Sequence, residues 1–192
     1  MRFRRQFARA PLVCALLLAS GGIIRAQDVS AMRNAASVVK TRTYVSLDPV
    51  PRGAEFQAAV VVDIENGYHV NSHKPLDAYL IPTTLTPQLP PGIHLADTLY
   101  PAGQLKKFSF SPGKGLDVYT GSVTLRLRLV ADEGSPLGEI TVPVTLRYQA
   151  CNDTACLPPV RVPVTVQFQL TAAGTGSQPV HPEIFSAVPP QK

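Results

Sequence analysis

Cys151 and Cys156 are the residues of this sequence whose type and spacing most directly suggest chemistry. They lie in the segment YQACNDTACLPP, residues 148–159, between two stretches of alternating apolar and polar residues that are typical of β-strands. If these stretches pair as a hairpin centred on Asp153 and Thr154, position 151 lies opposite position 156. Directly opposed strand positions bring Cβ atoms within the distance that a disulfide requires. The spacing therefore predicts that the pair can form a disulfide at the tip of a hairpin.

Three kinds of chemistry fit such a pair. A structural staple that closes a loop of about six residues contributes roughly 2 kcal/mol, toward the low end for disulfides. An exposed tip also lets an incoming thiolate approach along the S–S axis, which thiol–disulfide exchange requires. A zinc or copper site would add His69 and His73 to the two thiolates. On spacing alone the staple is favoured over exchange, and metal binding comes third because the cysteine spacing is not that of a zinc knuckle.

The elements that would position these residues are β-strands. Long segments with one apolar and one polar face cover residues 56–65, 123–130, 140–149 and 160–170, and shorter candidates cover 44–47, 68–72, 83–86, 93–95 and 107–110. The sequence also holds 19 Pro and 13 Gly, which suit turns, and no convincing helical pattern. We therefore predict an all-β fold, an immunoglobulin-like antiparallel β-sandwich of about seven to nine strands.

Two prolines and one glycine-rich segment qualify this prediction. In the symmetric hairpin, Pro143 falls opposite Val164 and Pro163 falls opposite Val144, so ladder donors are missing nearly side by side. The strands are therefore expected to diverge there, or one proline is expected to mark a bulge. Residues 113–115, Gly-Lys-Gly, are predicted to form a turn rather than a phosphate site.

The net charge of the chain reflects its first residues. The 192 residues contain 18 Lys and Arg against 13 Asp and Glu, a formal charge of +5. Five of the arginines lie within residues 1–26, so the remainder has 13 basic and 13 acidic side chains. A neutral remainder argues against general nucleic-acid binding.

Residues 1–26 have the pattern of a cleaved secretory signal peptide. An arginine-rich start precedes an apolar stretch shorter than the roughly 20 residues that span a bilayer, and Ala26 offers a small residue before a cut. Cys14 would be removed with this segment. We expect a protein exported to the periplasm, without a membrane span, with a flexible linker at 27–42, one domain at 43–171 and a disordered tail at 172–192.

The residues around the cysteines also resemble a known family. Tyr-Gln-Ala-Cys at 148–151 and Cys-Leu-Pro-Pro-Val at 156–160 are similar to the pattern of the periplasmic N-terminal domain of the thiol:disulfide interchange protein DsbD. The resemblance extends through residues 67–71, 91–94 and 97–100 and covers roughly 43–170. It implies an immunoglobulin-like domain that takes electrons from a membrane thiol–disulfide reductase and passes them to periplasmic thioredoxin-like proteins, without a cofactor.

The resemblance also implies roles for individual residues. Cys151 and Cys156 would be the redox pair of a thiol–disulfide oxidoreductase, and Cys156 would be the sulfur that forms mixed disulfides.

Further implied positions flank the sulfurs. A cap loop that shields them would fall on Asp97, Thr98, Leu99 and Tyr100, with Leu99 where the family has a phenylalanine. His69 and Asn71 would replace tyrosines that flank the family's site.

Two expectations about partners remain open. The sequence has no membrane electron-transfer domain and no thioredoxin-like domain, so the electron donor is expected to be a separate membrane protein. The alternative is a non-enzymatic immunoglobulin-like binding or accessory module in which the disulfide is structural.

Overall fold

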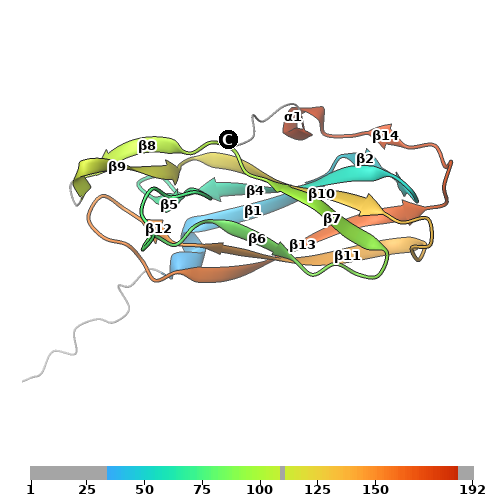
Figure 1. Cartoon of the computed structure of the whole chain (residues 1–192), viewed down its shortest axis with the longest axis horizontal. Coiled ribbons are helices and arrows are strands. Elements are labelled where there is room, and N and C mark those ends of the chain that lie inside the picture. Colours follow the sequence, from blue (N-terminus) through green and yellow to red (C-terminus); the bar gives the residue numbers. More distant parts are fainter. Residues whose placement is uncertain (1–33, 109–110, 186–192) are drawn as a thin grey trace, which may run out of the picture. The chain divides into compact units, whose positions relative to one another are not determined.

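The computed structural model describes residues 34–108 and 111–185, which belong to one compact unit (Figure 1). The predicted signal peptide, including Cys14, lies outside these residues. The elements in chain order are η2 (Ala35–Val38), β1 (Val39–Val45), β2 (Leu47–Asp48), β3 (Val50–Pro51), β4 (Glu55–Ile64), β5 (His69–Asn71), β6 (Thr84–Pro87), β7 (Ile93–Leu99), β8 (Gln104–Phe108), β9 (Ser111–Tyr119), β10 (Ser122–Ala131), β11 (Gly138–Tyr148), β12 (Ala150–Cys151), β13 (Val160–Thr171), β14 (Gln178–Pro179) and α1 (Pro182–Phe185). In this part of the chain, no helix has the length and apolar character needed to cross a membrane.

The strands form an all-β sandwich, as predicted. One sheet has the order β1-β4-β10-β7, and a second has the order β3-β13-β11-β6. A third sheet, β12-β5-β9-β8, carries the cysteine hairpin tip, and β14 pairs with β2. The ladders in the described part of the chain are antiparallel except β13–β3, which is parallel. The immunoglobulin-like antiparallel fold is therefore confirmed.

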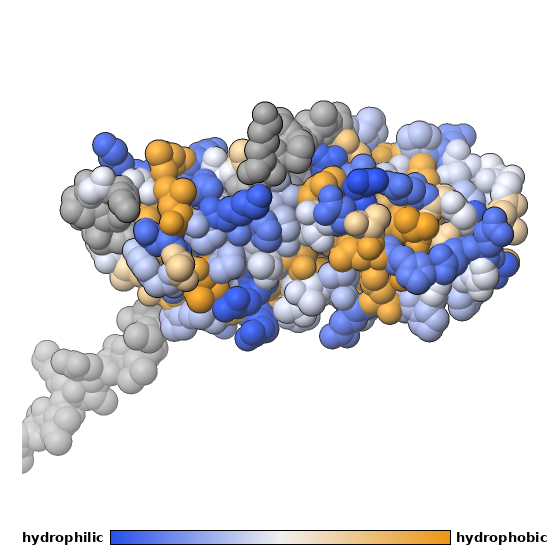
Figure 2. All heavy atoms as spheres, in the orientation of Figure 1, coloured by the Kyte–Doolittle hydropathy of each residue, from blue (hydrophilic) through white to orange (hydrophobic). Residues whose placement is uncertain are grey.

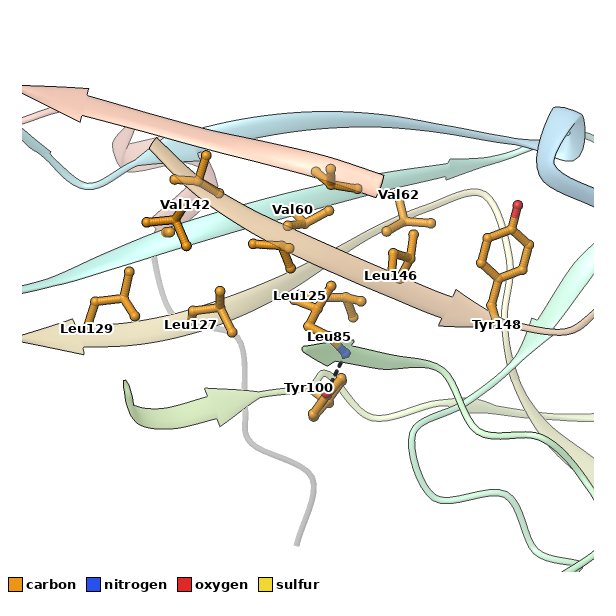
Figure 3. Packing of buried hydrophobic residues seen from close by; sticks show 14 of the residues in the cluster. Val60, Val62, Leu85, Tyr100, Leu125, Leu127, Leu129, Val142, Leu146 and Tyr148 are labelled. Atoms are coloured by element: carbon orange, nitrogen blue, oxygen red, sulfur yellow. Dashed lines mark hydrogen bonds between the residues drawn. The ribbon is translucent and has the colours of Figure 1, made fainter. Parts of the chain in front are cut away.

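The apolar faces predicted from the alternating pattern meet in the core (Figure 3). Side chains from β4 and β10 pack against those from β11 and β13. Fully buried members include Val60, Val62, Leu125, Leu127, Leu129, Val142, Leu146 and Tyr148. Burial of one such leucine or valine contributes about 1.5–3 kcal/mol, so this core dominates the stability of the fold.

Among the described residues, five large apolar side chains are exposed. They are Leu76, Tyr79, Leu95, Leu105 and Leu137. Figure 2 shows small apolar patches on the visible face that polar side chains separate from one another.

The β11–β13 ladder differs by one residue from the predicted register. Val144 lies opposite Val164, so Pro143 faces Thr165 and Pro163 faces Thr145. The two prolines are two positions apart in the ladder and therefore occupy the same type of pair. Proline fits a pair whose backbone nitrogens point away from the partner strand, because no ladder donor is then lost. The expected divergence occurs instead beyond Tyr148, where β12 joins another sheet.

The structure also differs from the prediction at both ends of the domain. Residues 35–42, predicted as part of a linker, form η2 and the first part of β1. Residues 178–185, predicted as part of a disordered tail, form β14 and α1. The backbone carbonyl of Phe185 accepts a hydrogen bond from buried Arg126 on β10, 3.0 Å away. This contact between distant segments leaves no local pattern in the sequence.

The predicted turn at residues 113–115 lies within β9. Within this strand, the side chain of Leu105 of β8 fills the space beside Gly115. A Cβ at position 115 would lie 2.8 Å from the Leu105 side chain. Glycine therefore marks a close cross-strand approach here rather than a turn.

Candidate functional site: the Cys151–Cys156 disulfide

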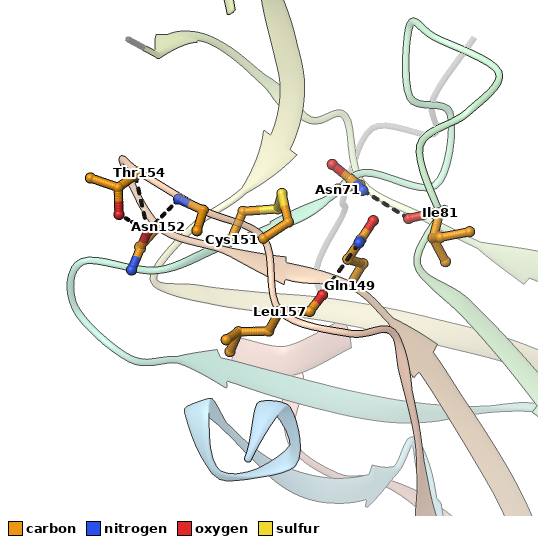
Figure 4. Close-up of a disulfide and its surroundings, with 9 residues drawn as sticks. Asn71, Ile81, Gln149, Cys151, Asn152, Thr154 and Leu157 are labelled. Carbon is orange, nitrogen blue, oxygen red and sulfur yellow. Dashed lines mark hydrogen bonds between the residues drawn. A yellow bond between two sulfur atoms is a disulfide. The ribbon is translucent and has the colours of Figure 1, made fainter. Parts of the chain in front are cut away.

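The disulfide lies at the tip of the hairpin that β11 and β13 form (Figure 4). The main ladder ends with Tyr148 opposite Val160, and Pro158 and Pro159 then interrupt the returning strand. Beyond them, Cys151 and Cys156 form an isolated antiparallel bridge with the register predicted from the sequence. Their sulfurs are bonded at 2.01 Å, and their Cα atoms are 3.9 Å apart.

The turn between the cysteines is held by hydrogen bonds of its own. The Asn152 backbone N–H donates to the carbonyl of Ala155 at 2.9 Å, and Leu157 N–H donates to Ala150 at 2.8 Å. The Asn152 side-chain oxygen accepts from Thr154 N–H, Thr154 hydroxyl and Ala155 N–H, each at 2.9 Å. Asparagine is suited to this role because its short side chain mimics a backbone acceptor in turns. The turn therefore has contacts that hold the cysteines close without the S–S bond.

The two cysteines differ sharply in exposure. Cys151 has no exposed surface, whereas Cys156 is exposed. An incoming thiolate must approach a sulfur along the S–S axis. Only the exposed Cys156 offers that approach without movement of the chain.

His69 lies directly opposite Cys151 in the β5–β12 ladder. Its ring stacks on Phe108 with 4.0 Å between centroids, and only 2% of the residue is exposed. Burial lowers the pKa of His69 to about 4, Lys106 adds to the shift and the Asp153 carboxylate opposes it. His69 is therefore a neutral aromatic neighbour of the buried sulfur near neutral pH.

Asn71 is the next residue of β5 on the same side of the strand as His69. Its side-chain nitrogen donates to the Ile81 carbonyl at 3.0 Å, and its backbone carbonyl accepts from the Thr83 hydroxyl at 2.6 Å. The residue is completely buried. Figure 4 shows its side chain between the disulfide and the segment that contains Ile81.

The sequence predictions did not identify the segment at 72–83 as part of the site. Leu80 anchors it in a small apolar cluster with Leu116 and Val118 of β9. Leu76 and Tyr79 remain 59% and 75% exposed. The available signal was three consecutive large apolar residues at 79–81 within a turn-rich stretch, but no local pattern places them beside Asn71.

Comparison with known proteins identifies the family of this chain. Residues 35–168, more than half of the chain, match the family model for the N-terminal part of the thiol:disulfide interchange protein DsbD. The chain belongs to the DsbD N-terminal domain family. A crystal structure of the Neisseria meningitidis DsbD N-terminal domain in the reduced form is 16% identical, with 80% of this chain and 98% of that chain covered and a TM-score of 0.44. No curated protein matches the chain.

The residues that the DsbD resemblance placed in a cap loop lie in and just after β7. Asp97 and Leu99 are paired with Arg128 and Arg126 of β10, in a different sheet from Cys151. The Asp97 carboxylate accepts a hydrogen bond from Thr98 N–H at 2.7 Å. A shielding role for this DsbD segment stays a prediction.

Tyr100, the last residue of that segment, is 8% exposed. Its hydroxyl accepts a hydrogen bond from Leu85 N–H at 2.9 Å, and its ring stacks on His73 at 3.6 Å between centroids. Burial raises the pKa of Tyr100, although its hydrogen bond with Leu85 opposes the shift. These contacts give Tyr100 a packing role beneath β6.

The ligands considered for a metal site do not assemble in this DsbD-family domain. Cys151 and Cys156 are bonded to each other, and His73 Nδ1 lies 3.2 Å from the Thr83 carbonyl oxygen. Among the described residues, no group of three or more His, Cys, Asp or Glu side chains could hold a metal ion.

Proposed function

We propose that this chain performs thiol–disulfide exchange in the periplasm through Cys151 and Cys156. It would receive electrons from a membrane thiol–disulfide reductase and pass them to thioredoxin-like proteins. Residues 1–26 would act as the cleaved signal peptide, and no cofactor would be needed because the two sulfurs carry the electrons themselves. Membership of the DsbD N-terminal family supports this class of reaction.

The observation that carries the proposal is the unequal exposure of the two sulfur-bearing residues. A staple has no need for an accessible cysteine, whereas exchange requires one sulfur that a partner can reach and a second that resolves the intermediate. Exposed Cys156 and buried Cys151 meet these two needs.

The electrons and bonds balance over one cycle. A donor thiolate attacks Sγ of Cys156, the S–S bond breaks, and Cys151 leaves as a thiolate. The donor's second thiolate then attacks the donor sulfur in the mixed disulfide, which releases Cys156 as a thiolate and oxidises the donor to a disulfide. Two electrons have entered the pair. The Cys156 thiolate next attacks an acceptor disulfide, and Cys151 displaces the acceptor as a dithiol while the original disulfide forms again.

The hydrogen bonds of the turn also support exchange over a staple. Asn152 and the backbone bonds of residues 150–157 hold the hairpin tip independently of the disulfide. A ring of about six residues adds only about 2 kcal/mol to stability in the loop-entropy model. The reduced protein is therefore expected to stay folded with its two thiols close together.

Mixed-disulfide trapping tests the proposal. Cys151→Ala leaves the exposed Cys156 thiol without its resolving partner, so covalent complexes with thioredoxin-like proteins should accumulate and disappear on reduction. Cys156→Ala is the matched control, because it keeps one cysteine but buries it, and it should trap little. Equal trapping by both variants, or by neither, would contradict the proposed roles.

The reduction potential of the pair tests the same proposal in the unmodified protein. Equilibration with glutathione should give a value within the range of exchange proteins, between about −270 and −120 mV. A value below about −300 mV, together with a large loss of thermal stability on reduction, would instead support the accessory module with a structural disulfide.

A further inference from the structure

Only one end of the buried Asn71 side-chain amide has a hydrogen-bond partner among the described residues. Its nitrogen donates to the Ile81 carbonyl at 3.0 Å. Its oxygen, Oδ1, is buried and has no hydrogen-bond partner among the described residues. Buried side-chain acceptors in folded proteins are nearly always paired, so an exception needs a physical explanation.

The strand pairing places this oxygen near the disulfide. Cys151 lies directly opposite His69, and Asn71 is two residues along β5 from His69. Opposed residues of an antiparallel pair project to the same side, and the diagonal neighbour two residues on lies about 7–8 Å away, within reach of a side chain. Asn71 and Cys151 are therefore diagonal neighbours on one face of the β5–β12 pair.

The Ile81 carbonyl determines which end of the amide faces the sulfurs. A carbonyl oxygen can pair only with the amide nitrogen, so the nitrogen must point toward Ile81. The oxygen then points away from Ile81, and Figure 4 shows it on the side of the disulfide. Leu80, Leu116 and Val118 form the apolar cluster on this side of the strand.

A disulfide sulfur offers Oδ1 no donor, but a thiol does. Reduction by a donor dithiol breaks the S–S bond, adds two electrons and oxidises the donor to a disulfide. The Cys151 sulfur then takes up a proton and becomes an S–H group, which is a hydrogen-bond donor. Reduction therefore creates a donor beside an acceptor that has no partner in the oxidised form.

We propose that Asn71 is a positioning residue that accepts a hydrogen bond from the Cys151 thiol in the reduced protein. This inference rests on the proposed exchange function and adds a determinant of its energetics. Asn71 stabilises the reduced form relative to the oxidised form and thereby raises the reduction potential. It also keeps the buried sulfur protonated, so that the exposed Cys156 is the sulfur available as a thiolate.

The test is the redox equilibrium of the full chain with glutathione. Asn71→Leu removes the acceptor while retaining an apolar side chain, and Asn71→Ala serves if leucine does not fit. Either variant should make the disulfide about 3- to 10-fold more stable, which is a potential about 15–30 mV more negative. Val70→Ala is the matched control, because Val70 is a buried neighbour on the same strand that points the other way. It should lower the melting temperature and leave the potential unchanged.

A spectroscopic measurement on the reduced wild-type protein does not depend on the folding of the Asn71 variants. The S–H stretching band that disappears in Cys151→Ala should lie at lower frequency than that of a non-bonded thiol. An unshifted band, or Asn71 variants that change stability but not potential, would overturn the inference. The wild-type potential tests the exchange function separately, because its absolute value can fall in the exchange range whether or not the Asn71 variants shift it.

Discussion

The difference between the two cysteines arises from the strands on which they lie. Cys151 is held inside the third sheet by its pairing with β5, whereas Cys156 follows the turn and, among the described residues, is bridged to Cys151 alone. The same covalent bond therefore has one accessible end. The reactivity of each sulfur therefore depends on its burial. The neighbours of Cys151 on β5, His69 and Asn71, are buried as well.

His69 gives a pH-dependent prediction. Its pKa is lowered from 6.5 to about 4, chiefly by burial. As the pH falls, the unfolded chain therefore takes up a proton at this histidine at a higher pH than the folded protein does. Stability from this group is complete above about pH 6.5 and is lost as the pH falls toward 4. The wild type should lose about 2.5 kcal/mol from this source by pH 4.5. His69→Phe keeps the stack on Phe108 but does not titrate. Between neutral pH and pH 4.5, its free energy of unfolding should therefore fall less than that of the wild type, by the amount given for His69.

Urea denaturation of the oxidised protein at several pH values measures this difference. Nuclear magnetic resonance of the wild-type imidazole provides an independent check, since the His69 ring should remain neutral until the pH approaches 4. Parallel stability profiles for the wild type and His69→Phe would show that burial does not control this histidine.

At the scale of elements, the hairpin tip combines a short covalent ring with a turn that hydrogen bonds already define. The register changes by one residue between the Tyr148–Val160 pair and the Cys151–Cys156 pair, with Pro158 and Pro159 at the change. This change releases Ala150 and Cys151 from the main sheet to pair with β5. The prolines therefore help to place the disulfide in the third sheet.

Removal of the Asn152 side chain should weaken the disulfide. Asn152→Ala loses the acceptor for Thr154 and Ala155, so the two thiols of the reduced form should be held together less closely. The equilibrium constant for disulfide formation should fall about 3- to 10-fold, a potential about 15–30 mV less negative. Thr154→Val, which removes only one of the three donors, should have a smaller effect. A more negative potential in Asn152→Ala would contradict a preorganised turn.

The elements that the sequence predicted correctly have strong local patterns. β11 and β13 alternate apolar and polar residues along most of their length, β10 alternates over residues 122–129, and β4 has a continuous apolar run at 58–62. The opposed cysteines follow from the symmetry of one hairpin. Residues 39–42, the first part of β1, were predicted as linker because the stretch before position 43 is rich in small and polar residues. Residues 113–115 of β9 were predicted as a turn because of their glycines. The positions of the segment at 72–83 and of α1 depend on contacts with residues that lie far away in the chain. His69 and Asn71 were named through a family resemblance, but their burial could be known only from the fold.

On the scale of the whole molecule, the main core extends into the sheet that carries the disulfide. The largest apolar cluster joins the two main sheets and also includes Val70 of β5 and Ala150 of β12, whereas Leu80, Leu116 and Val118 form a separate cluster beside β5. Tyr148 belongs to the first cluster although it lies only three residues before Cys151. Asn71 is paired with Val118 of the second cluster, whereas Tyr148 lies in the first. We therefore expect a change at Tyr148 to alter stability without altering the redox potential.

Tyr148→Phe provides the test of that independence. The Tyr148 hydroxyl is buried and donates to the Ala35 carbonyl at 2.9 Å, which joins β11 to η2 across 113 residues of sequence. Burial raises the pKa of Tyr148 to about 12, so the hydroxyl remains a donor at neutral pH. The variant leaves a carbonyl without its donor and should lower the free energy of unfolding by about 1–2 kcal/mol in guanidinium denaturation. Its potential against glutathione should match that of the wild type.

Tyr44→Phe is the control for this substitution. Tyr44 is only partly buried, and its hydroxyl accepts from exposed Arg42 at 3.3 Å, so the change should cost less than about 0.5 kcal/mol. A Tyr148→Phe protein that is as stable as the wild type would show that the η2 contact contributes nothing. If the potential of Tyr148→Phe shifts as far as that of Asn71→Leu, the core and the disulfide are coupled. Loss of a hydroxyl that bonds to η2 would then have changed the relative energies of the oxidised and reduced sulfurs.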